Sequence, residues 1–249
     1  MADKQAGFVG PGHGARDFGR YGRLVLLGML TFSILNLIFG LEGATVLSPQ
    51  EVIAGIEKVQ QNRDQKLAGY NALEHYKVHN SHFKESAELA ARVFYTKSAG
   101  KSHQILWRRG PEFLQKRVIN RILNEDDIFS RGSERSNVRL TSANYRMKVQ
   151  GIRLFRGERC YVVNLRPRVN RVSLIEGTAW FKTTDFSLLR IEGKPAASPS
   201  FWTGRPFVER EYTVIDGFSF PKHSRATSSG FLSGKSELDI DYSKYEVSR

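Results

Sequence analysis

The sequence is poor in cysteine, with Cys160 as its one thiol among 249 residues. A single thiol excludes an intramolecular disulfide and a zinc site built from several thiolates. Because Cys160 lies deep in the chain, a lipid-modified cysteine directly behind a leader segment is excluded as well. We interpret Cys160 as a residue of the protein interior, since no activating motif accompanies it.

Motifs of catalysis are also lacking. Gly-Lys-Ser occurs at 100–102 and at 234–236, but the glycine that a phosphate-binding loop needs five residues earlier is absent in both cases. A Gly-x-Ser-x-Gly nucleophile motif is not found. His75, His79 and His82 lie close together without a carboxylate motif, so solvent-exposed strand positions explain them better than a metal site. We therefore expect no catalysis, no metal and no cofactor.

Acidic residues are few compared with basic ones. The chain has 25 Asp and Glu against 38 Lys and Arg, which gives a formal net charge of +13. Such an excess indicates an anionic partner, either nucleic acid or an anionic membrane surface.

One long uncharged run is present, over residues 24–41 (LVLLGMLTFSILNLIFGL). As a helix it would span roughly 27 Å, close to the thickness of a bilayer core. Arg16, Arg20 and Arg23 precede the run, and the first charge after it is Glu42. This asymmetry predicts a cytoplasmic N-terminal region over 1–23 and export of everything beyond the run. Residues 24–41 fit either the core of a cleaved signal peptide or a retained transmembrane anchor.

The predicted export distinguishes between nucleic acid and an anionic membrane surface as the partner. Residues 1–44 hold four basic and three acidic side chains, so nearly all of the positive charge belongs to residues 45–249. We expect this part in the periplasm, soluble after cleavage or anchored to the inner membrane by residues 24–41. That location excludes nucleic acid and favours anionic lipid, glycan or a protein partner.

The exported part alternates between two periodicities. Ser48, Pro49 and Glu51 form a helix start with a capping box, and Val52 and Ile56 continue it at helical spacing. A second helical region begins at Pro111. Alternation with a period of two predicts strands over 70–79, 87–96, 103–109, 144–152, 158–166, 174–182, 186–192, 207–215, 218–226 and 235–247. The segments 125–127 and 132–137 are predicted to form a break. The fold class is α+β, with one curved antiparallel sheet of about ten strands wrapped around helices.

The order of short motifs in the C-terminal half resembles a known family. It runs through Asn144-Tyr145, Gly157-x-x-Cys160-Tyr161, 177–181 (GTAWF), 185–193 (DFSLLRIEG), 198–202 (SPSFW), Asp216-Gly217-Phe218 and Leu238-x-Ile240-x-Tyr242. This order resembles the bacterial outer-membrane lipoprotein-sorting proteins of the LolA/LolB-like superfamily. The resemblance covers about residues 145–245.

The resemblance implies an incomplete β-barrel with helices across its mouth. Its apolar interior would take acyl chains of lipid or lipoprotein, without catalysis, in sorting to the outer membrane. The alternative is an envelope sensor or adaptor that uses the same fold to bind a partner protein.

Three groups of candidate site residues follow. The apolar side chains expected to line the interior are Phe113, Leu114, Val118, Ile122, Leu123, Trp180, Leu238 and Ile240. Phe201 and Trp202 are expected in a loop that covers the mouth or touches a membrane. A basic surface for docking to anionic phospholipid or phosphorylated glycolipid is expected from Arg146, Lys148, Arg153, Arg156, Arg159, Arg166, Arg168 and Arg171.

Overall fold

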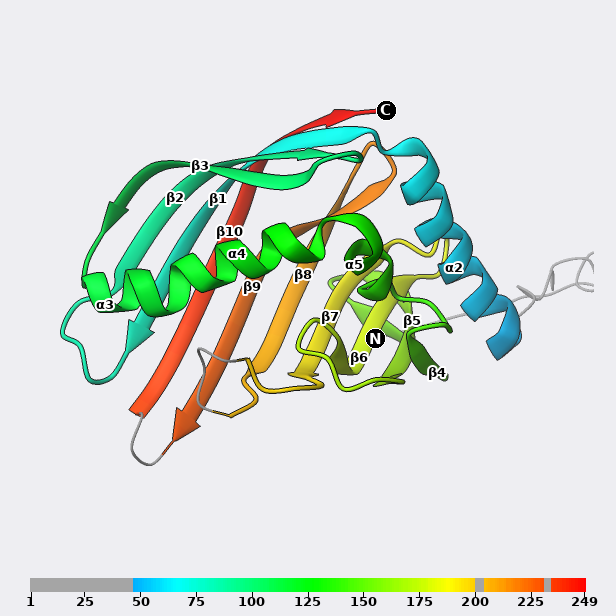
Figure 1. Ribbon diagram of the computed structural model, residues 1–249. Helices are drawn as coiled ribbons and strands as arrows, with labels where there is room; N and C mark the ends of the chain where they lie inside the picture. Colours follow the sequence, from blue (N-terminus) through cyan, green and yellow to red (C-terminus); the bar gives the residue numbers. More distant parts are fainter. Residues whose placement is uncertain (1–46, 200–203, 231–233) are drawn as a thin grey trace, which may run out of the picture. The chain divides into compact units, whose positions relative to one another are not determined.

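The computed structural model describes residues 47–199, 204–230 and 234–249, which belong to the compact unit Leu47–Arg249 (Figure 1). The expected N-terminal region 1–23 and hydrophobic segment 24–41 lie outside the described residues. Within the described part, no helix is long and apolar enough to cross a membrane.

A single antiparallel sheet of ten strands makes up most of this unit. Its order is β3-β2-β1-β10-β9-β8-β7-β6-β5-β4, so the last strand pairs with the first and joins the two halves of the chain. The strands are β1 (Gly69–Asn80), β2 (Ala87–Thr96), β3 (Gly100–Arg109), β4 (Tyr145–Phe155), β5 (Glu158–Pro167), β6 (Ile175–Lys182), β7 (Leu188–Pro195), β8 (Phe207–Ile215), β9 (Phe218–Gly230) and β10 (Gly234–Ser248). Strands β3 and β4 are the two edges of this order, so the sheet stays open rather than closing into a barrel. The predicted sheet of about ten antiparallel strands is confirmed.

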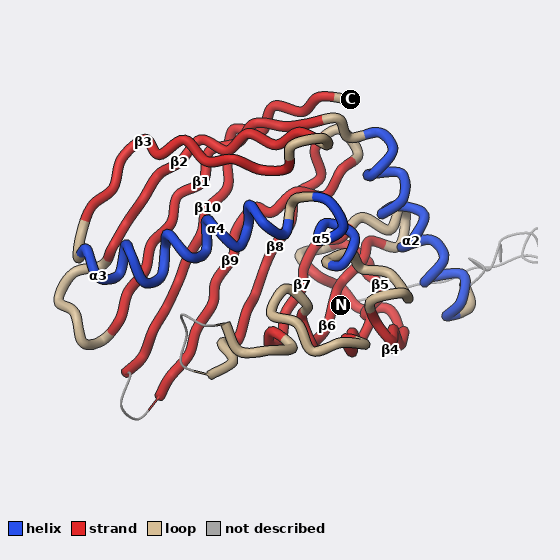
Figure 2. Tube along the Cα trace, viewed as in Figure 1, coloured by secondary structure: helices blue, strands red, loops and turns tan. Residues whose placement is uncertain are grey.

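The helices gather on one side of the sheet, which curves around them (Figures 1 and 2). They are α2 (Pro49–Lys66), α3 (Glu112–Leu114), η1 (Gln115–Ile119, a π-helical stretch), α4 (Asn120–Phe129) and α5 (Gly132–Asn137). Segments α3, η1 and α4 follow one another without a break and cross the concave face; we call residues 112–129 the helical cover. The prediction of a break over 125–127 and 132–137 was wrong, because the first segment lies inside α4 and the second forms α5.

Helix α2 begins as the sequence predicted. The backbone N–H of Ser48 donates to Glu51 Oε2 at 2.7 Å, and the N–H of Glu51 donates to Ser48 Oγ at 3.3 Å. The side chains of Val52 and Ile56 are fully buried in the core cluster formed with β4–β7. Gly55 allows the close approach, since a Cβ atom there would lie 2.5 Å from the ring of Phe186. Helix α2 therefore covers one end of the concave face and leaves the rest to the helical cover.

Candidate functional site

The first half of the helical cover places apolar side chains on the concave face. Leu114, Val118, Ile119 and Leu123 are each at most 9% exposed. They share one core cluster with side chains of β1, β2, β9 and β10, namely Tyr76, Val78, Ala87, Leu89, Ala91, Ala226, Leu238 and Ile240, and Ile122 packs against it. Six of the eight residues predicted to line the interior therefore meet here. Whether they contact a ligand stays a prediction.

Phe113 does not belong to this cluster, and its expected position facing the concave sheet was wrong. Its side chain is 55% exposed and stacks on Phe83 of the β1–β2 turn, with ring centroids 5.7 Å apart. The guanidinium of Arg117 lies 5.8 Å from the Phe113 ring. Residues one position apart on a helix point about 100° apart. The same turn that buries Leu114 therefore directs Phe113 to the rim.

Trp180 faces the opposite side of the sheet from the one expected. Successive strand side chains alternate between faces. Ala179 and Phe181 are fully buried on the concave face, and Trp180 consequently points outward. There its ring lies 6.5 Å from that of Phe155 and 5.6 Å from the guanidinium of Arg190.

The second half of the helical cover is held to the sheet by polar contacts. Lys101 Nζ on β3 lies 2.5 Å from Asp126 Oδ2, and His103 Nδ1 lies 2.9 Å from Asp127 Oδ1. On β1, the hydroxyl of Tyr76 donates to Glu74 Oε2. We call Glu74, Lys101, His103, Asp126 and Asp127 the polar cluster. It joins β1, β3 and α4, three elements that are remote in the sequence.

The members of the polar cluster shift one another's ionisation. Burial opposes the charged form of Glu74, but the Lys101 ammonium, His103 and Tyr76 together hold the pKa of this carboxyl below its usual range. Burial also opposes the charge on Lys101, yet Asp126 and other groups raise its pKa well above the ordinary value. For His103 the same competition between burial and the carboxylates Glu74 and Asp126 ends in a raised pKa. All these groups therefore favour their charged forms.

The helical cover packs directly against the concave face through its buried apolar side chains. Two surface recesses lie elsewhere. One, of about 170 Å³, is lined by Asn71, Ala72, Leu73, Arg92, Phe94, Lys244 and Glu246. The other, of about 370 Å³, is lined by residues 176–178 and 192–194 together with Arg205 and Phe207. Neither of these two recesses is lined by residues of the helical cover. The described conformation is thus a closed one, in which the cover occupies the concave face itself.

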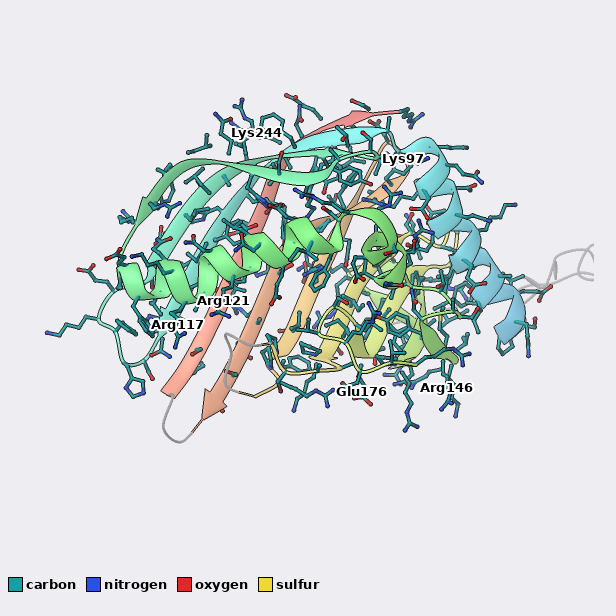
Figure 3. The ribbon with its side chains drawn as sticks, viewed as in Figure 1. Lys97, Arg117, Arg121, Arg146, Glu176 and Lys244 are labelled. Atoms are coloured by element: carbon teal, nitrogen blue, oxygen red, sulfur yellow. The ribbon has the colours of Figure 1, made fainter. Side chains whose placement is uncertain are left out.

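The expected basic surface is divided by the fold. A bulge between Val149 and Gly151 reverses the alternation along β4. By register with β5, four exposed side chains share the outer face, and we call them the basic face: Arg146, Lys148, Arg153 and Arg166. Figure 3 shows Arg146 at the β4 end of the molecule.

The other four basic side chains lie elsewhere. Arg159 is paired with Leu154, on the side opposite to the basic face. Arg156 is at the β4–β5 turn and contacts Glu211 at 2.7 Å. Arg168 donates to the carbonyl of Ser142, and Arg171 contacts Glu134 at 3.1 Å. Phe201 and Trp202 of the expected mouth loop lie outside the described residues.

The sequence interpretation missed the polar cluster. It singled out His75, His79 and His82 and passed over His103. His75 lies 3.4 Å from Glu88, and His79 and His82 are exposed. One signal in the sequence could have indicated the polar cluster. Lys101, His103 and Ile105 are alternate residues of β3, so the side chains of Lys101 and His103 lie on the same face of the sheet as the apolar side chain of Ile105.

An open antiparallel sheet with a helical cover defines the class of fold. No family model and no curated protein matches the chain. A LolA superfamily protein from Nitrosomonas europaea is 14% identical, with 82% of this chain and 95% of that one aligned at a TM-score of 0.47. An outer membrane lipoprotein-sorting protein domain from Vibrio parahaemolyticus is 10% identical, over 80% and 93% of the two chains, at 0.47. A DUF1329 family protein from Desulfovibrio piger is 10% identical, over 81% and 94%, at 0.43.

Proposed function

We propose that this chain is a non-catalytic envelope protein that binds acyl chains of lipid or lipoprotein between the helical cover and the concave face. Its role would be lipid or lipoprotein sorting to the outer membrane. One observation carries the proposal: the cover contacts the sheet mainly through apolar side chains over residues 114–123 and through the polar cluster at Asp126 and Asp127.

This division suits a cover that opens at one end. Ion pairs at Lys101 and His103 hold the second half in place. The first half is held mainly by non-directional apolar contacts, together with two hydrogen bonds from Gln115 Nε2 to the carbonyls of Glu88 and Arg109. Lifting the first half would expose Val78, Leu89 and Leu238, which form an apolar surface on neighbouring strands. An acyl chain can replace Leu114 and Ile119 there at little cost, because it restores the same kind of contact.

The acyl-binding proposal predicts saturable binding of a fluorescent fatty acid by the purified chain. We expect one class of site, and native mass spectrometry and lipid extraction should find co-purifying lipid. The matched control is the chain with Leu89→Arg. This variant places a charge on the part of the sheet that contacts the helical cover and should abolish probe binding. Binding that is unchanged in this variant, or no binding by the wild type, would contradict the proposal.

The periplasmic location rests on the charge asymmetry around residues 24–41. We propose it for either a cleaved signal or a retained anchor. A C-terminal alkaline phosphatase fusion that is inactive, with an active cytoplasmic reporter, would contradict it.

We further propose that the basic face docks on anionic phospholipid. Arg146 and Arg166 lie directly opposite each other on β4 and β5, where like charges repel. Glu176 of β6 offsets part of the charge of Arg166, and a lipid phosphate would offset the rest. The planar guanidinium groups of this face match the geometry of lipid phosphates.

Docking predicts that Arg146→Gln with Arg166→Gln weakens binding to vesicles containing phosphatidylglycerol by about 30-fold, at roughly 1 kcal/mol for each charge. Arg168→Gln with Arg171→Gln removes the same charge at positions that already have protein partners and should change binding much less. Vesicle co-sedimentation at several salt concentrations measures both. Equal losses in the two double variants would indicate a net-charge effect and contradict a defined basic face.

The adaptor alternative is supported by a different feature, the open edge of the sheet. Strand β3 has one unpaired side and carries Leu106 and Trp107, which are 47% and 44% exposed. An extended partner segment could pair with such an edge. Capture of one protein without any bound lipid, lost on Trp107→Lys, would favour the adaptor.

A further inference from the structure

Three potential metal ligands from three elements converge beneath the helical cover. They are Glu74 of β1, His103 of β3 and Asp126 of α4, and one ligand atom from each lies within 4.8 Å of the other two. His103 Nε2 is 3.7 Å from Glu74 Oε2 and 3.6 Å from Asp126 Oδ2.

These separations are too long for hydrogen bonds but suit two ligands of one ion. Ligand atoms about 2.0–2.2 Å from a tetrahedral metal are about 3.3–3.6 Å from each other. The side chain of His103 is 4% exposed, and its Nε2 has no hydrogen-bond partner. A buried ring nitrogen without a partner is uncommon and requires an explanation.

Asp127 gives His103 the second contact that metal-binding histidines have. Its Oδ1 lies 2.9 Å from Nδ1, and a carboxylate there fixes the ring and directs the Nε2 lone pair toward the other two carboxylates. Glu74 is oriented in turn by the hydroxyl of Tyr76. The three ligand atoms are therefore positioned by neighbours that do not themselves need to touch the ion.

The charges in direct contact leave room for a cation. Glu74, Asp126 and Asp127 supply three negative charges, and Lys101 at 2.5 Å from Asp126 supplies one positive charge. Arg210, a further cation on β8, donates to Ser224 Oγ. The groups in direct contact carry two net negative charges, which one divalent cation would balance, and Arg210 adds one positive charge that acts on Asp126.

We propose that Glu74, His103 and Asp126 bind a divalent transition-metal cation, with Zn²⁺ as the best match for one imidazole and two carboxylates. The ion would join α4 to β1 and β3 and so fix the second half of the helical cover. This proposal is independent of the acyl-binding function, because it concerns other residues and needs no lipid.

The test uses the full-length chain without a histidine tag, treated with EDTA and titrated with ZnCl₂ by calorimetry. We expect one equivalent of Zn²⁺ per chain and a melting temperature that rises with Zn²⁺ concentration. His103→Gln and Glu74→Gln should lose the site, and Asp127→Asn should weaken it about 10- to 100-fold. The double variant His79→Gln with His82→Gln is the matched control, because it removes two exposed imidazoles and should bind normally.

Several results would overturn the site. If the wild-type chain does not bind one equivalent of Zn²⁺, the proposed site is excluded, and no variant is needed. Binding that survives in His103→Gln but disappears in the His79/His82 double variant would assign the metal to the surface. Stronger binding of Mg²⁺ than of Zn²⁺ would contradict a transition-metal site. If His103→Gln does not fold, the visible spectrum of the wild-type chain with Co²⁺ decides, since a tetrahedral site gives d–d bands that are much more intense than the weak bands of octahedral aqueous Co²⁺ and lie at longer wavelength.

Discussion

Truncating Ile119 to alanine is expected to lower the free energy of unfolding by about 2–5 kcal/mol, because it opens a cavity between the helical cover and the sheet. Ile119 is fully buried and shares a core cluster with Leu89 and Ile240. Urea denaturation measures the loss. If the seat of the cover is also the acyl-binding site, a fluorescent fatty acid should restore part of this stability, since the acyl chain fills the cavity.

Phe113→Ala is the matched control for this prediction. It removes a larger side chain from the same helical segment, but one that is 55% exposed and contacts Phe83. The expected loss is no more than about 1 kcal/mol, the scale of a single aromatic pair. Equal losses of unfolding free energy in Ile119→Ala and Phe113→Ala would contradict the packing of the helical cover on the sheet through Ile119. A full loss in Ile119→Ala that no fatty acid restores would indicate a permanently closed core and contradict acyl binding there.

Replacing Gly177 with alanine is expected to cost about 3 kcal/mol or more, as overpacking without room for adjustment does. Gly177 of β6 is paired with Gly193 of β7. A Cβ atom at Gly177 would lie 1.9 Å from the carbonyl oxygen of Glu192 and 2.7 Å from the Cα of Gly193. Both are backbone atoms, so β6 and β7 would have to separate in the middle of the sheet.

Gly157→Ala tests whether backbone conformation alone explains such a loss. Gly157 has φ of 83° in the β4–β5 turn, and a Cβ atom there meets nothing within 4 Å. Its substitution should cost roughly 1–2 kcal/mol through strain alone. Comparable denaturation midpoints for the two alanine variants would mean that β6 and β7 are less closely packed than described.

The positions of the helices and strands could be predicted because the signals are local. The capping box at Ser48 and Glu51 and the alternation of Leu238 and Ile240 with acidic residues each depend on neighbours within a few positions. The short helix α5 was missed because the segment 132–137 is rich in residues that also favour turns.

The facing of individual side chains could be predicted only where alternation is undisturbed. The bulge in β4 places the basic residues of this hairpin on two different faces of the sheet. No feature of the sequence marks Gly151 as the site of a bulge rather than a turn. Trp180 was expected to line the interior as an apolar residue. In β6, however, the side chains that face the core are those of Ala179 and Phe181.

The sequence by itself determined an antiparallel sheet with helices on one side, the apolar side of the helical cover and an excess of positive charge. The tertiary structure alone decided that Glu74, His103 and Asp126 meet, that the cover closes on the concave face, and that four basic side chains share an outer face. The physical reason is distance along the chain. Periodicity and capping act over a few residues, whereas these three arrangements depend on strand order, on register and on how a helix seats on strands that are far away in the sequence.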